Sequence, residues 1–454
     1  MDARQPAPQR PPVALSIAGS DSGGGAGIQA DVKTIEACGA FAATAITSVT
    51  AQNTRGVADS HRVPTAQLEA QLDAVLGDFD VRGAKTGMLG TRETVETVVE
   101  YAEELPALVV DPVMVAASGD RLLESDAEAA YEDLVAEAAL VTPNADEAAV
   151  LTGIDLADAD DARAAGEALV EMGAEAALVK GGHLDGADVV DVLVTAESVE
   201  ELRHPRVATD ATHGSGCTLS AAIAAHLARG AAVERAVEAG VDLLARAVRY
   251  PLAVGEGPGS VHHVVELRER AARQPTAESV DWIVEQFVDR DVSALVPEVG
   301  MNVVGATPYA EIPGETAAVE GRITRTMSGV APNRGVRFGA SSHVARFLLA
   351  VREFDADCRF AVNCRFDDDV ADALAALDGP VAAYDRSAEP ADVKEREGST
   401  QQWGAREAVE SVDGTPVAVT DRGEVGKEAI AKLLAPDAET LVERTFAVLD
   451  ALAD

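Results

Sequence analysis

Lysine is scarce in this sequence: six of its 37 basic residues are lysines, set against 77 aspartates and glutamates. The formal net charge is −40 at pH 7, and the acidic residues are spread along the whole chain. Nucleic acid and anionic membranes both require clustered basic residues, so we expect neither as a partner. Spread acidity with few lysines indicates a surface suited to molar salt, where the Debye length shrinks to about 3 Å and self-repulsion is screened. We therefore expect a halophilic, cytoplasmic protein.

Cysteine is also rare, with four residues at positions 38, 217, 358 and 364 and no C-x-x-C pair. This pattern favours neither a zinc site nor a disulfide framework, so we expect reduced thiols in a cytosolic protein. No stretch approaches the roughly 18 consecutive apolar residues of a membrane-spanning helix. Residues 1–12, MDARQPAPQRPP, lack the apolar segment of a signal peptide, and we expect them to form a disordered tail.

The chain of 454 residues is long enough for two or three domains. Short apolar runs alternate with helical patterns from residue 13 to about 266, which predicts a parallel sheet covered by helices on both faces. A charged, then turn-like segment at 267–278 is expected to be a linker, and the alternation resumes at 279–454 as a second, smaller α/β domain. Ligands bind beyond the carboxyl ends of such strands. Polar residues stand there after apolar runs, namely Gln52, Asp111, Asn144 and Lys180.

The segment 212–220, THGSGCTLS, combines a glycine loop with the start of a helix. Apolar Leu219, Ile223 and Leu227 share one face and predict a helix from Thr218 to Arg229. A glycine loop before a helix offers free N–H groups and a positive dipole end, which suits phosphate. Cys217 falls in the first turn, where that field lowers a thiol's pKa and favours a role as a base. Taken alone, such a loop is more often an ordinary turn and cap than a phosphate site.

Seven motifs occur in the order in which one enzyme family carries them, at 17–34 (IAGSDSGGGAGIQADVKT), 50–54 (TAQNT), 85–90 (KTGMLG), 111–114 (DPVM), 142–148 (TPNADEA), 179–183 (VKGGH) and 212–220. Over residues 13–266 the chain resembles the hydroxymethylpyrimidine and phosphomethylpyrimidine kinases of thiamine synthesis, members of the ribokinase-like superfamily. Most sugar kinases of that superfamily have an aspartate base where Cys217 stands here. A pure sugar kinase with an inert tail is therefore disfavoured by Cys217 and Gln52.

The resemblance assigns roles to residues at matching positions. Gln52 is expected to contact the pyrimidine, since an amide supplies both a donor and an acceptor. Gly19 and Asp31 match further positions of the substrate pocket. Lys180 matches the position near the ATP phosphates, and the backbone amides of the loop would hold the transferred phosphoryl group. The loop residues are Gly214, Ser215, Gly216 and Cys217, and Cys217 would accept the proton of the alcohol.

Asn144 and Glu147 form the N-x-x-E pattern that this superfamily uses around magnesium and phosphate, and Asp111 is a candidate for the same network. Mg²⁺ retains several waters, so these residues are expected to act partly through water. The same pair also fits a helix N-cap with its capping-box partner, and both interpretations can hold together. The resemblance thus implies ATP and Mg²⁺ as cofactors, in-line phosphoryl transfer, small-molecule substrates, and a homodimer.

Behind the kinase-like region, the segments NVVGA, EGRIT and RFGASSHVARFLLAV resemble the archaeal-type thiamine-phosphate synthase domain. Arg322 and His343 match that family's essential arginine and histidine. A helix is expected from Ser342, with Ser341 or Ser342 as its cap and His343 in its first turn. The implied reaction joins a pyrimidine pyrophosphate to a thiazole phosphate and releases pyrophosphate. Two alternatives stay open: a non-catalytic thiamine-phosphate sensor, and, for His343 alone, an ordinary surface histidine.

Overall fold

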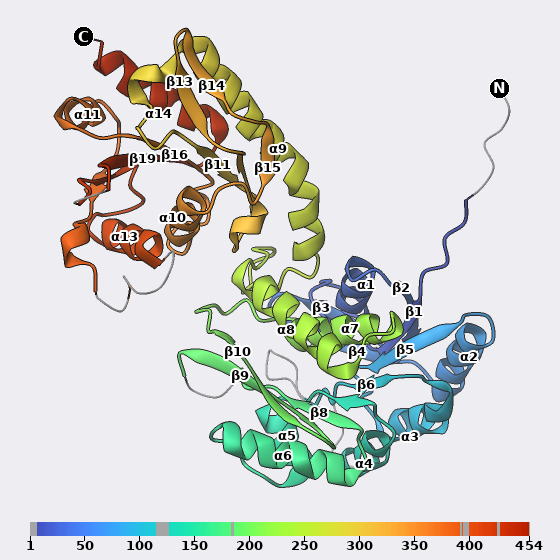
Figure 1. The fold of residues 1–454 in the computed structure, drawn as a ribbon. Helices are drawn as coiled ribbons and strands as arrows, with labels where there is room; N and C mark the ends of the chain where they lie inside the picture. The colour runs from blue at the N-terminus through green and yellow to red at the C-terminus, as the bar shows by residue number, and fades with distance from the viewer. Residues whose placement is uncertain are drawn as a thin grey trace, which may run out of the picture. The chain divides into compact units, whose positions relative to one another are not determined.

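The computed structural model describes residues 7–114, 127–182, 186–390, 393, 399–424 and 427–453. The chain separates into two compact units, 1–266 and 267–454 (Figure 1). Of the expected disordered tail, residues 1–6 lie outside the described residues, and residues 7–12 form neither helix nor strand. No described helix is both long enough and apolar enough to cross a membrane.

The first unit is built on one large sheet and a separate two-stranded ribbon. Its strands are β1 (Val13–Ala18), β2 (Phe41–Ile46), β3 (Ser48–Asn53), β4 (Gly56–Arg62), β5 (Val81–Thr86), β6 (Leu108–Val110), β7 (Leu140–Val141), β8 (Ala176–Val179), β9 (Asp188–Thr195) and β10 (Val199–Pro205). The large sheet has the order β10-β9-β8-β7-β6-β5-β1-β2, and β3 pairs with β4. The strands from β2 to β8 run parallel, whereas β9 and β10 are antiparallel at one edge.

Helices cover both faces of this sheet. They are α1 (Gly27–Ala37), α2 (Thr65–Leu76), α3 (Arg92–Glu100), α4 (Glu128–Ala136), α5 (Ala145–Thr152), α6 (Ala159–Met172), α7 (Ser215–Ala228) and α8 (Val233–Arg249). Leu15 and Ile17 of β1 point into a core shared with α2, α3, α4 and α6, while Ala14 packs with α1 and α7 on the opposite face. Because both faces are covered, the strands are near-continuous apolar runs. The expected layered α/β architecture is confirmed in this unit.

The second unit has a seven-stranded sheet and a two-stranded hairpin. Its strands are β11 (Val303–Ala306), β12 (Thr316–Val319), β13 (Ile323–Thr326), β14 (Gly329–Pro332), β15 (Val336–Phe338), β16 (Phe360–Arg365), β17 (Val381–Ala383), β18 (Ala418–Asp421) and β19 (Ile430–Ala435). The sheet order is β15-β12-β11-β16-β19-β18-β17, and β13 pairs with β14. Only the β17–β18 pair in this sheet is parallel. The unit is therefore α/β, as expected, but its sheet is largely antiparallel.

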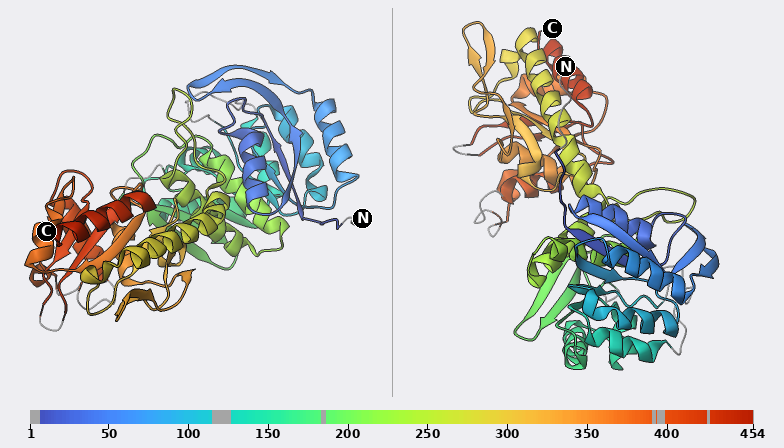
Figure 2. Two further views of the ribbon diagram at one scale, coloured as in Figure 1. Left: turned by 90° about the horizontal axis from the view of Figure 1, so that it is seen from above. Right: turned by 90° about the vertical axis from the view of Figure 1, so that its right-hand side faces the viewer.

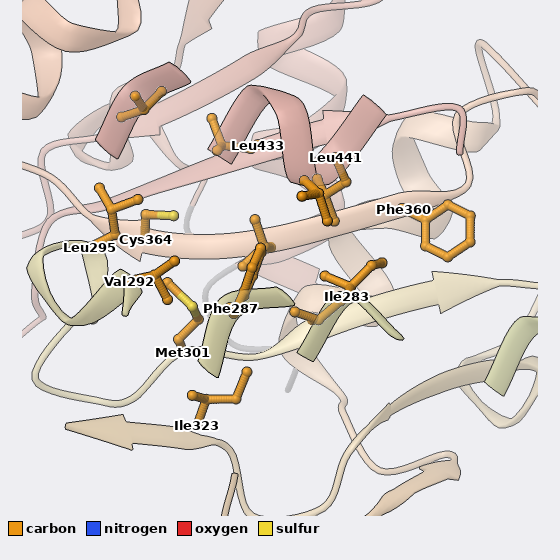
Figure 3. Close-up of a cluster of buried hydrophobic side chains, with 14 of the residues drawn as sticks. Ile283, Phe287, Val292, Leu295, Met301, Ile323, Phe360, Cys364, Leu433 and Leu441 are labelled. Carbon is orange, nitrogen blue, oxygen red and sulfur yellow. The ribbon is translucent and has the colours of Figure 1, made fainter. Parts of the chain in front are cut away.

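Helices again form a layer on each side of this sheet. They are α9 (Val265–Arg290), α10 (His343–Arg352), α11 (Asp368–Leu374), α13 (Ser399–Glu410) and α14 (Ala438–Ala451). Figure 3 shows Ile283 and Phe287 of α9 in a cluster with Cys364 of β16, Leu433 of β19 and Leu441 of α14. The opposite face of the sheet packs against α10 and α13. The side chains of a strand thus alternate between two cores.

The expected linker at 267–278 is not a linker in the structure. Helix α9 runs without interruption from Val265 to Arg290 and includes this segment (Figure 2). Its sequence LRERAARQ is rich in strong helix formers, which outweigh the charge that suggested a loop. Pro275 suggested a break, but it lies inside the helix, where its fixed φ is compatible with helical geometry. Val280 and Phe287 anchor the later turns in the core of the second unit.

Candidate active sites

A cavity of about 630 Å³ lies at the carboxyl ends of the parallel strands of the first unit. Parallel sheets bind ligands at this edge, and the sequence pattern predicted polar residues at the same place. The sequence analysis named thirteen site residues. Ten of them line this cavity, two belong to the second unit, and Asp31 lies in the first unit but does not line the cavity. The predicted residues that line the cavity are Gly19, Gln52, Asp111, Asn144, Glu147, Lys180, Gly214, Ser215, Gly216 and Cys217.

The glycine loop at 212–216 leads directly into α7, which begins at Ser215, three residues earlier than expected. Gly214 is the N-cap and has a φ of 82°, a left-handed conformation that favours glycine. The first turn of α7 therefore contains Ser215, Gly216 and Cys217. The Ser215 N–H donates to the carbonyl oxygen of Thr212 at 3.1 Å, and the N–H groups of Gly216 and Cys217 have no acceptor within the helix. These amides and the helix dipole face the cavity and make this end of it suitable for a phosphoryl group.

Asp21 organises the second glycine loop of the cavity, and the sequence analysis missed it. Its carboxylate accepts hydrogen bonds from the backbone N–H groups of Gly23 (2.8 Å), Gly25 (2.9 Å) and Ala26 (2.8 Å). Burial raises the pKa of Asp21, but the hydrogen bonds from His213 and from the backbone outweigh burial and hold it below its usual value. An aspartate just before a glycine run is a typical turn signal, so the sequence did contain a clue.

Gln52 on β3 and His213 on the loop before α7 meet at the substrate side of the cavity. The Nε2 atom of Gln52 lies 3.3 Å from Nε2 of His213, and the latter lies 3.2 Å from Oδ2 of Asp21. Gly19 follows β1, and a Cβ atom there would lie 2.6 Å from the Ser48 hydroxyl. The chain is thus closely packed around Gly19. The side-chain amide of Gln52 lines the cavity, where a ligand can reach it.

Asp31 does not line the cavity, although the sequence analysis expected it in the substrate pocket. It is fully buried, accepts a hydrogen bond of 2.6 Å from Ser16 and forms an ion pair with Lys85 at 3.1 Å. Burial alone lowers the pKa of Lys85, but the nearby acidic groups of Asp31, Cys217 and Asp111 outweigh it and raise that pKa. A charged lysine therefore lies next to Cys217, and sequence reasoning missed it.

Cys217 lines the cavity together with Gln52, as expected, but the expected lowering of its pKa is wrong. Burial raises the pKa of the Cys217 thiol to about 12, and the charge of Lys85 acts in the opposite direction without cancelling this. Proximity to a helix N-terminus suggested a reactive thiolate, but removal from water dominates here. The side chain is a thiol at neutral pH.

Lys180, Asp111 and Glu147 form a charged network beside the first turn of α7. The Lys180 ammonium lies 3.2 Å from Asp111 Oδ1 and 3.8 Å from Glu147 Oε2. Burial raises the pKa of Glu147 to about 7, while the charge of Lys180 acts in the opposite direction. A Cβ atom on Gly216 would lie 3.4 Å from the Lys180 ammonium, so this network lies close to the first turn of α7.

Asn144 and Glu147 form the capping box of α5. The Asn144 side chain accepts from the Glu147 N–H at 2.9 Å, and the Glu147 carboxylate accepts from the Asn144 N–H at 2.8 Å. The capping interpretation is thus confirmed. In the part of the chain that the structure describes, no group of three or more His, Cys, Asp or Glu residues is placed to hold a metal ion.

In the second unit, Arg322 and His343 lie in one electrostatic environment. Arg322 occupies the turn between β12 and β13 with a φ of 81°, and its guanidinium donates to the carbonyl oxygen of Val299. His343 is the first residue of α10. Burial lowers the pKa of His343, and the positive charges of Arg322, Arg346, Lys432 and Arg386 lower it further.

The expected serine cap of α10 is not formed. Ser342 is the N-cap residue, but its side chain makes no capping hydrogen bond. Its backbone has helical dihedral angles rather than the extended ones that point a capping hydroxyl at the N2 or N3 amide. The free amides of the first turn remain beside His343.

A buried polar group between β17 and β18 adjoins this region, and no sequence pattern indicated it. The Asp421 carboxylate pairs with Arg386 and accepts a hydrogen bond of 3.1 Å from the Tyr384 hydroxyl. Lys432 on β19 projects toward the same face, with its ammonium 5.8 Å from the centre of the Tyr384 ring.

Two family models match the chain. Residues 21–262 match the model described as phosphomethylpyrimidine kinase, and residues 279–446 match that of thiamine-phosphate synthase ThiN. The chain is 49% identical over 257 residues to a hydroxymethylpyrimidine/phosphomethylpyrimidine kinase of Rhizobium meliloti, which covers 55% of this chain and 96% of the relative.

Two further comparisons cover the first unit. A thiamine biosynthesis bifunctional protein ThiED of Geobacter sulfurreducens is 42% identical over 264 residues, or 56% of this chain and 54% of that protein. The structure of an ADP complex of Bacillus subtilis pyridoxal kinase has a TM-score of 0.54 and 34% identity, covering 57% of this chain and 99% of that one. Since the kinase model spans more than half of the sequence, this chain belongs to the phosphomethylpyrimidine kinase family and carries a ThiN-type thiamine-phosphate synthase region behind the kinase.

Proposed function

We propose that the first unit uses ATP to phosphorylate 4-amino-5-hydroxymethyl-2-methylpyrimidine, and then phosphorylates the resulting monophosphate to the pyrophosphate. The observation that carries this proposal is that Gln52 and Cys217 line one cavity at the start of α7. One small ligand can therefore contact both side chains, with its aminopyrimidine edge at the Gln52 amide and its alcohol at Cys217. This pairing favours a pyrimidine alcohol over a sugar as the substrate.

Each of the residues that line the cavity has a distinct role in this proposal. Gln52 orients the pyrimidine, and the amides of Gly214, Ser215 and Gly216 hold the transferred phosphoryl group. Lys180 neutralises charge on the nucleotide phosphates, which is the main requirement of phosphoryl transfer. Cys217 acts through its minor thiolate form, which the charge of Lys85 stabilises. This thiolate receives the proton of the alcohol as the new P–O bond forms and the bond to the departing ADP breaks.

Magnesium fits the residues beside Lys180. Mg²⁺ is usually held by one or two carboxylates together with waters and substrate phosphates, rather than by a complete set of protein ligands. Asp111 and Glu147 supply two carboxylates, and Asn144 fixes Glu147 through the capping box. When bound, the ion would neutralise negative charge on the nucleotide phosphates.

For the second unit we propose condensation of the pyrimidine pyrophosphate with thiazole phosphate to give thiamine phosphate and pyrophosphate. The carbon–oxygen bond to the pyrophosphate breaks while a carbon–nitrogen bond to the thiazole forms. Arg322, His343 and the free amides of α10 surround the place where leaving-group charge would develop. A cationic site in a chain with net charge −40 supports an anionic substrate.

One experiment tests both proposals. The purified chain is incubated with the hydroxymethylpyrimidine, MgATP and thiazole phosphate, and products are followed by chromatography. We expect the pyrimidine pyrophosphate and then thiamine phosphate, with only thiamine phosphate lost in His343→Ala. Formation of the pyrophosphate without thiamine phosphate, together with binding of thiamine phosphate, would instead favour the sensor function for the second unit.

We further propose that the protein works as a homodimer in a salt-rich cytoplasm. The spread of acidic residues supports the second part, because screening by salt reduces self-repulsion. Sedimentation in molar KCl tests the first part. A single species at the mass of one chain would contradict a dimer.

A further inference from the structure

Lys432 is a buried lysine without an acidic partner. It is 3% exposed and lies on β19, where its register neighbours are Asn363 of β16 and Val419 of β18. Among the described residues, its ammonium forms neither a hydrogen bond nor an ion pair. It lies over the ring of Phe347, 4.3 Å from the ring centre, and 5.8 Å from the centre of the Tyr384 ring.

The carboxylate whose charge acts on Lys432, that of Asp421, already has three other partners. Asp421 pairs with Arg386, accepts from the Tyr384 hydroxyl at 3.1 Å, and accepts from the Gly423 N–H at 2.8 Å. A buried ammonium without a hydrogen-bonding partner is costly, because it has lost water and gained little in return. Cation–π contacts with the two rings recover only part of this cost.

Apart from Asp421, the charged groups that act on Lys432 and His343 are cations. Phe347 lies one helical turn beyond His343 on α10, so the contact of Lys432 with Phe347 places the ammonium on the His343 side of that helix. The charges of Lys432, Arg322, Arg346 and Arg386 all act on His343. Asp421 balances only one of these charges, that of Arg386, so a chain with net charge −40 gathers an excess of positive charge at one helix N-terminus. A singly charged anion would leave most of that charge uncompensated.

We infer that Lys432 directly binds the diphosphate group of a small-molecule ligand at the N-terminus of α10. The inference rests on the proposed synthase function of this site and adds a residue to it. Burial lowers the pKa of Lys432 to about 8, so the side chain is still mostly charged at neutral pH. In the proposed reaction the ammonium would pair with the oxygen that gains negative charge as the pyrophosphate leaves.

The test measures binding of inorganic pyrophosphate to the full chain by calorimetry and by the thermal midpoint, at one fixed KCl concentration. The variants are Lys432→Met and, as a matched control, Lys427→Met, which removes an exposed lysine paired with Glu424 at 2.9 Å. Both variants keep the kinase cavity, so any pyrophosphate bound there is common to all samples. Inorganic phosphate is titrated in parallel, to separate a diphosphate site from a general phosphate site.

We expect Lys432→Met to weaken one class of pyrophosphate site by about 10- to 100-fold, the usual effect of losing a charged hydrogen bond. Without ligand its thermal midpoint should equal or exceed that of the wild type, because an unpaired buried charge is replaced by an apolar chain. Lys427→Met should bind like the wild type. Phosphate should bind more weakly than pyrophosphate at the same site.

A purely structural Lys432 would give the reverse pattern, namely a lower midpoint in Lys432→Met with unchanged pyrophosphate binding, and this would overturn the inference. So would a wild-type chain that does not bind pyrophosphate in its second unit, or that prefers phosphate. If Lys432→Met does not fold, Lys432→Gln is judged by the same criteria. Thiamine phosphate formation is scored separately: binding through Lys432 without turnover would overturn only the proposed synthase, and turnover with unchanged Lys432→Met binding would overturn only the inference.

Discussion

The backbone of Gly214 lies so close to the carbonyl oxygen of Gly25 that a Cβ atom on Gly214 would overlap that oxygen. The relationship is nearly reciprocal, since a Cβ atom on Gly25 would lie 2.6 Å from Cδ2 of His213. Two glycine loops that are almost 190 residues apart in the sequence therefore pack backbone against backbone at the cavity. A side chain at either position would therefore push the two loops apart at the cavity.

The first prediction concerns Gly214→Ala. We expect it to reduce kinase activity strongly and to lower stability by more than about 2 kcal/mol, because left-handed strain and overpacking add together. Gly230→Ala is the matched control, since Gly230 has a φ of 87° and no atom within 4 Å of an added Cβ. Thermal midpoints and the rate of pyrimidine phosphorylation provide the comparison. Equal effects of the two substitutions would show that the contact with Gly25 is unimportant.

The second prediction concerns Cys217→Ala. Phosphorylation of the alcohol requires removal of a proton, whereas the second transfer begins from an anionic phosphate oxygen. We therefore expect the first transfer to lose about 10²- to 10⁴-fold in rate, the range of general-base effects, and the second transfer to lose much less. Steady-state rates with each pyrimidine substrate measure this. Equal losses in both transfers would point to a packing role for the thiol.

The raised pKa of Cys217, about 12, adds a pH dependence to the first transfer. If the thiolate is the reactive form, then at any pH below the pKa its fraction rises about tenfold for each unit by which the pH increases. The wild-type rate of the first transfer should then increase with pH across the neutral and mildly alkaline range, and Cys217→Ala should lack this increase. A flat wild-type profile would show that the proton leaves by another route.

Sequence patterns predicted the first site well because its residues follow apolar strands and glycine loops, whose positions at the sheet edge are fixed by topology. Gln52, Asp111 and Lys180 reach one cavity for that reason. Such patterns could not predict how deeply each group is buried or which charged group lies beside it. Cys217 stands at a helix N-terminus, as expected, yet burial dominates its pKa, and Asp31 is paired with Lys85 across 54 positions in the sequence.

The second unit was harder to predict because an antiparallel sheet joins strands without a fixed strand–helix rhythm. Alternating strands and helices over 279–454 were expected, together with the helix that contains His343, but nothing indicated the β13–β14 hairpin. The cationic environment of His343 depends on Arg386 and Lys432, which lie on different elements and form no local motif. Composition indicated an acidic chain and gave no sign of a local basic site.

The third prediction concerns the buried pair of Asp31 and Lys85. Removal of one partner leaves an uncompensated buried charge, so Asp31→Asn and Lys85→Met should each cost about 3–5 kcal/mol. The double variant should cost less than the sum of the two, as coupled residues do. Asp80→Asn is the control, because Asp80 pairs with Arg82 with 77% and 61% of their side chains exposed, and such pairs contribute about 0–1 kcal/mol. Denaturant midpoints measure all four variants, and additive costs would contradict the coupling.

The fourth prediction concerns Glu147→Gln. Glutamine preserves the capping box with Asn144, since its side-chain oxygen can still accept from the backbone N–H. It removes one of the two carboxylates proposed for magnesium, so the Mg²⁺ concentration needed for half-maximal kinase activity should rise at least about tenfold, while the thermal midpoint changes little. Glu137→Gln, on the exposed end of α4, is the control. An unchanged magnesium requirement with lower stability would assign Glu147 to capping alone.

The fifth prediction concerns salt. The chain carries 77 acidic against 37 basic residues, and many of its ion pairs are exposed, such as Arg55–Glu256 with 66% and 80% of the side chains exposed. Exposed pairs contribute little, so repulsion among the excess carboxylates dominates in dilute buffer and is screened only when the Debye length falls toward about 3 Å, near 1 M salt. We therefore expect the thermal midpoint and kinase activity to rise together with KCl into the molar range. A neutral osmolyte at matched osmolality is the control, because it stabilises compact states without screening charge. Full stability and activity in dilute buffer, or an equal gain with the osmolyte, would show that charge repulsion is not what limits this fold.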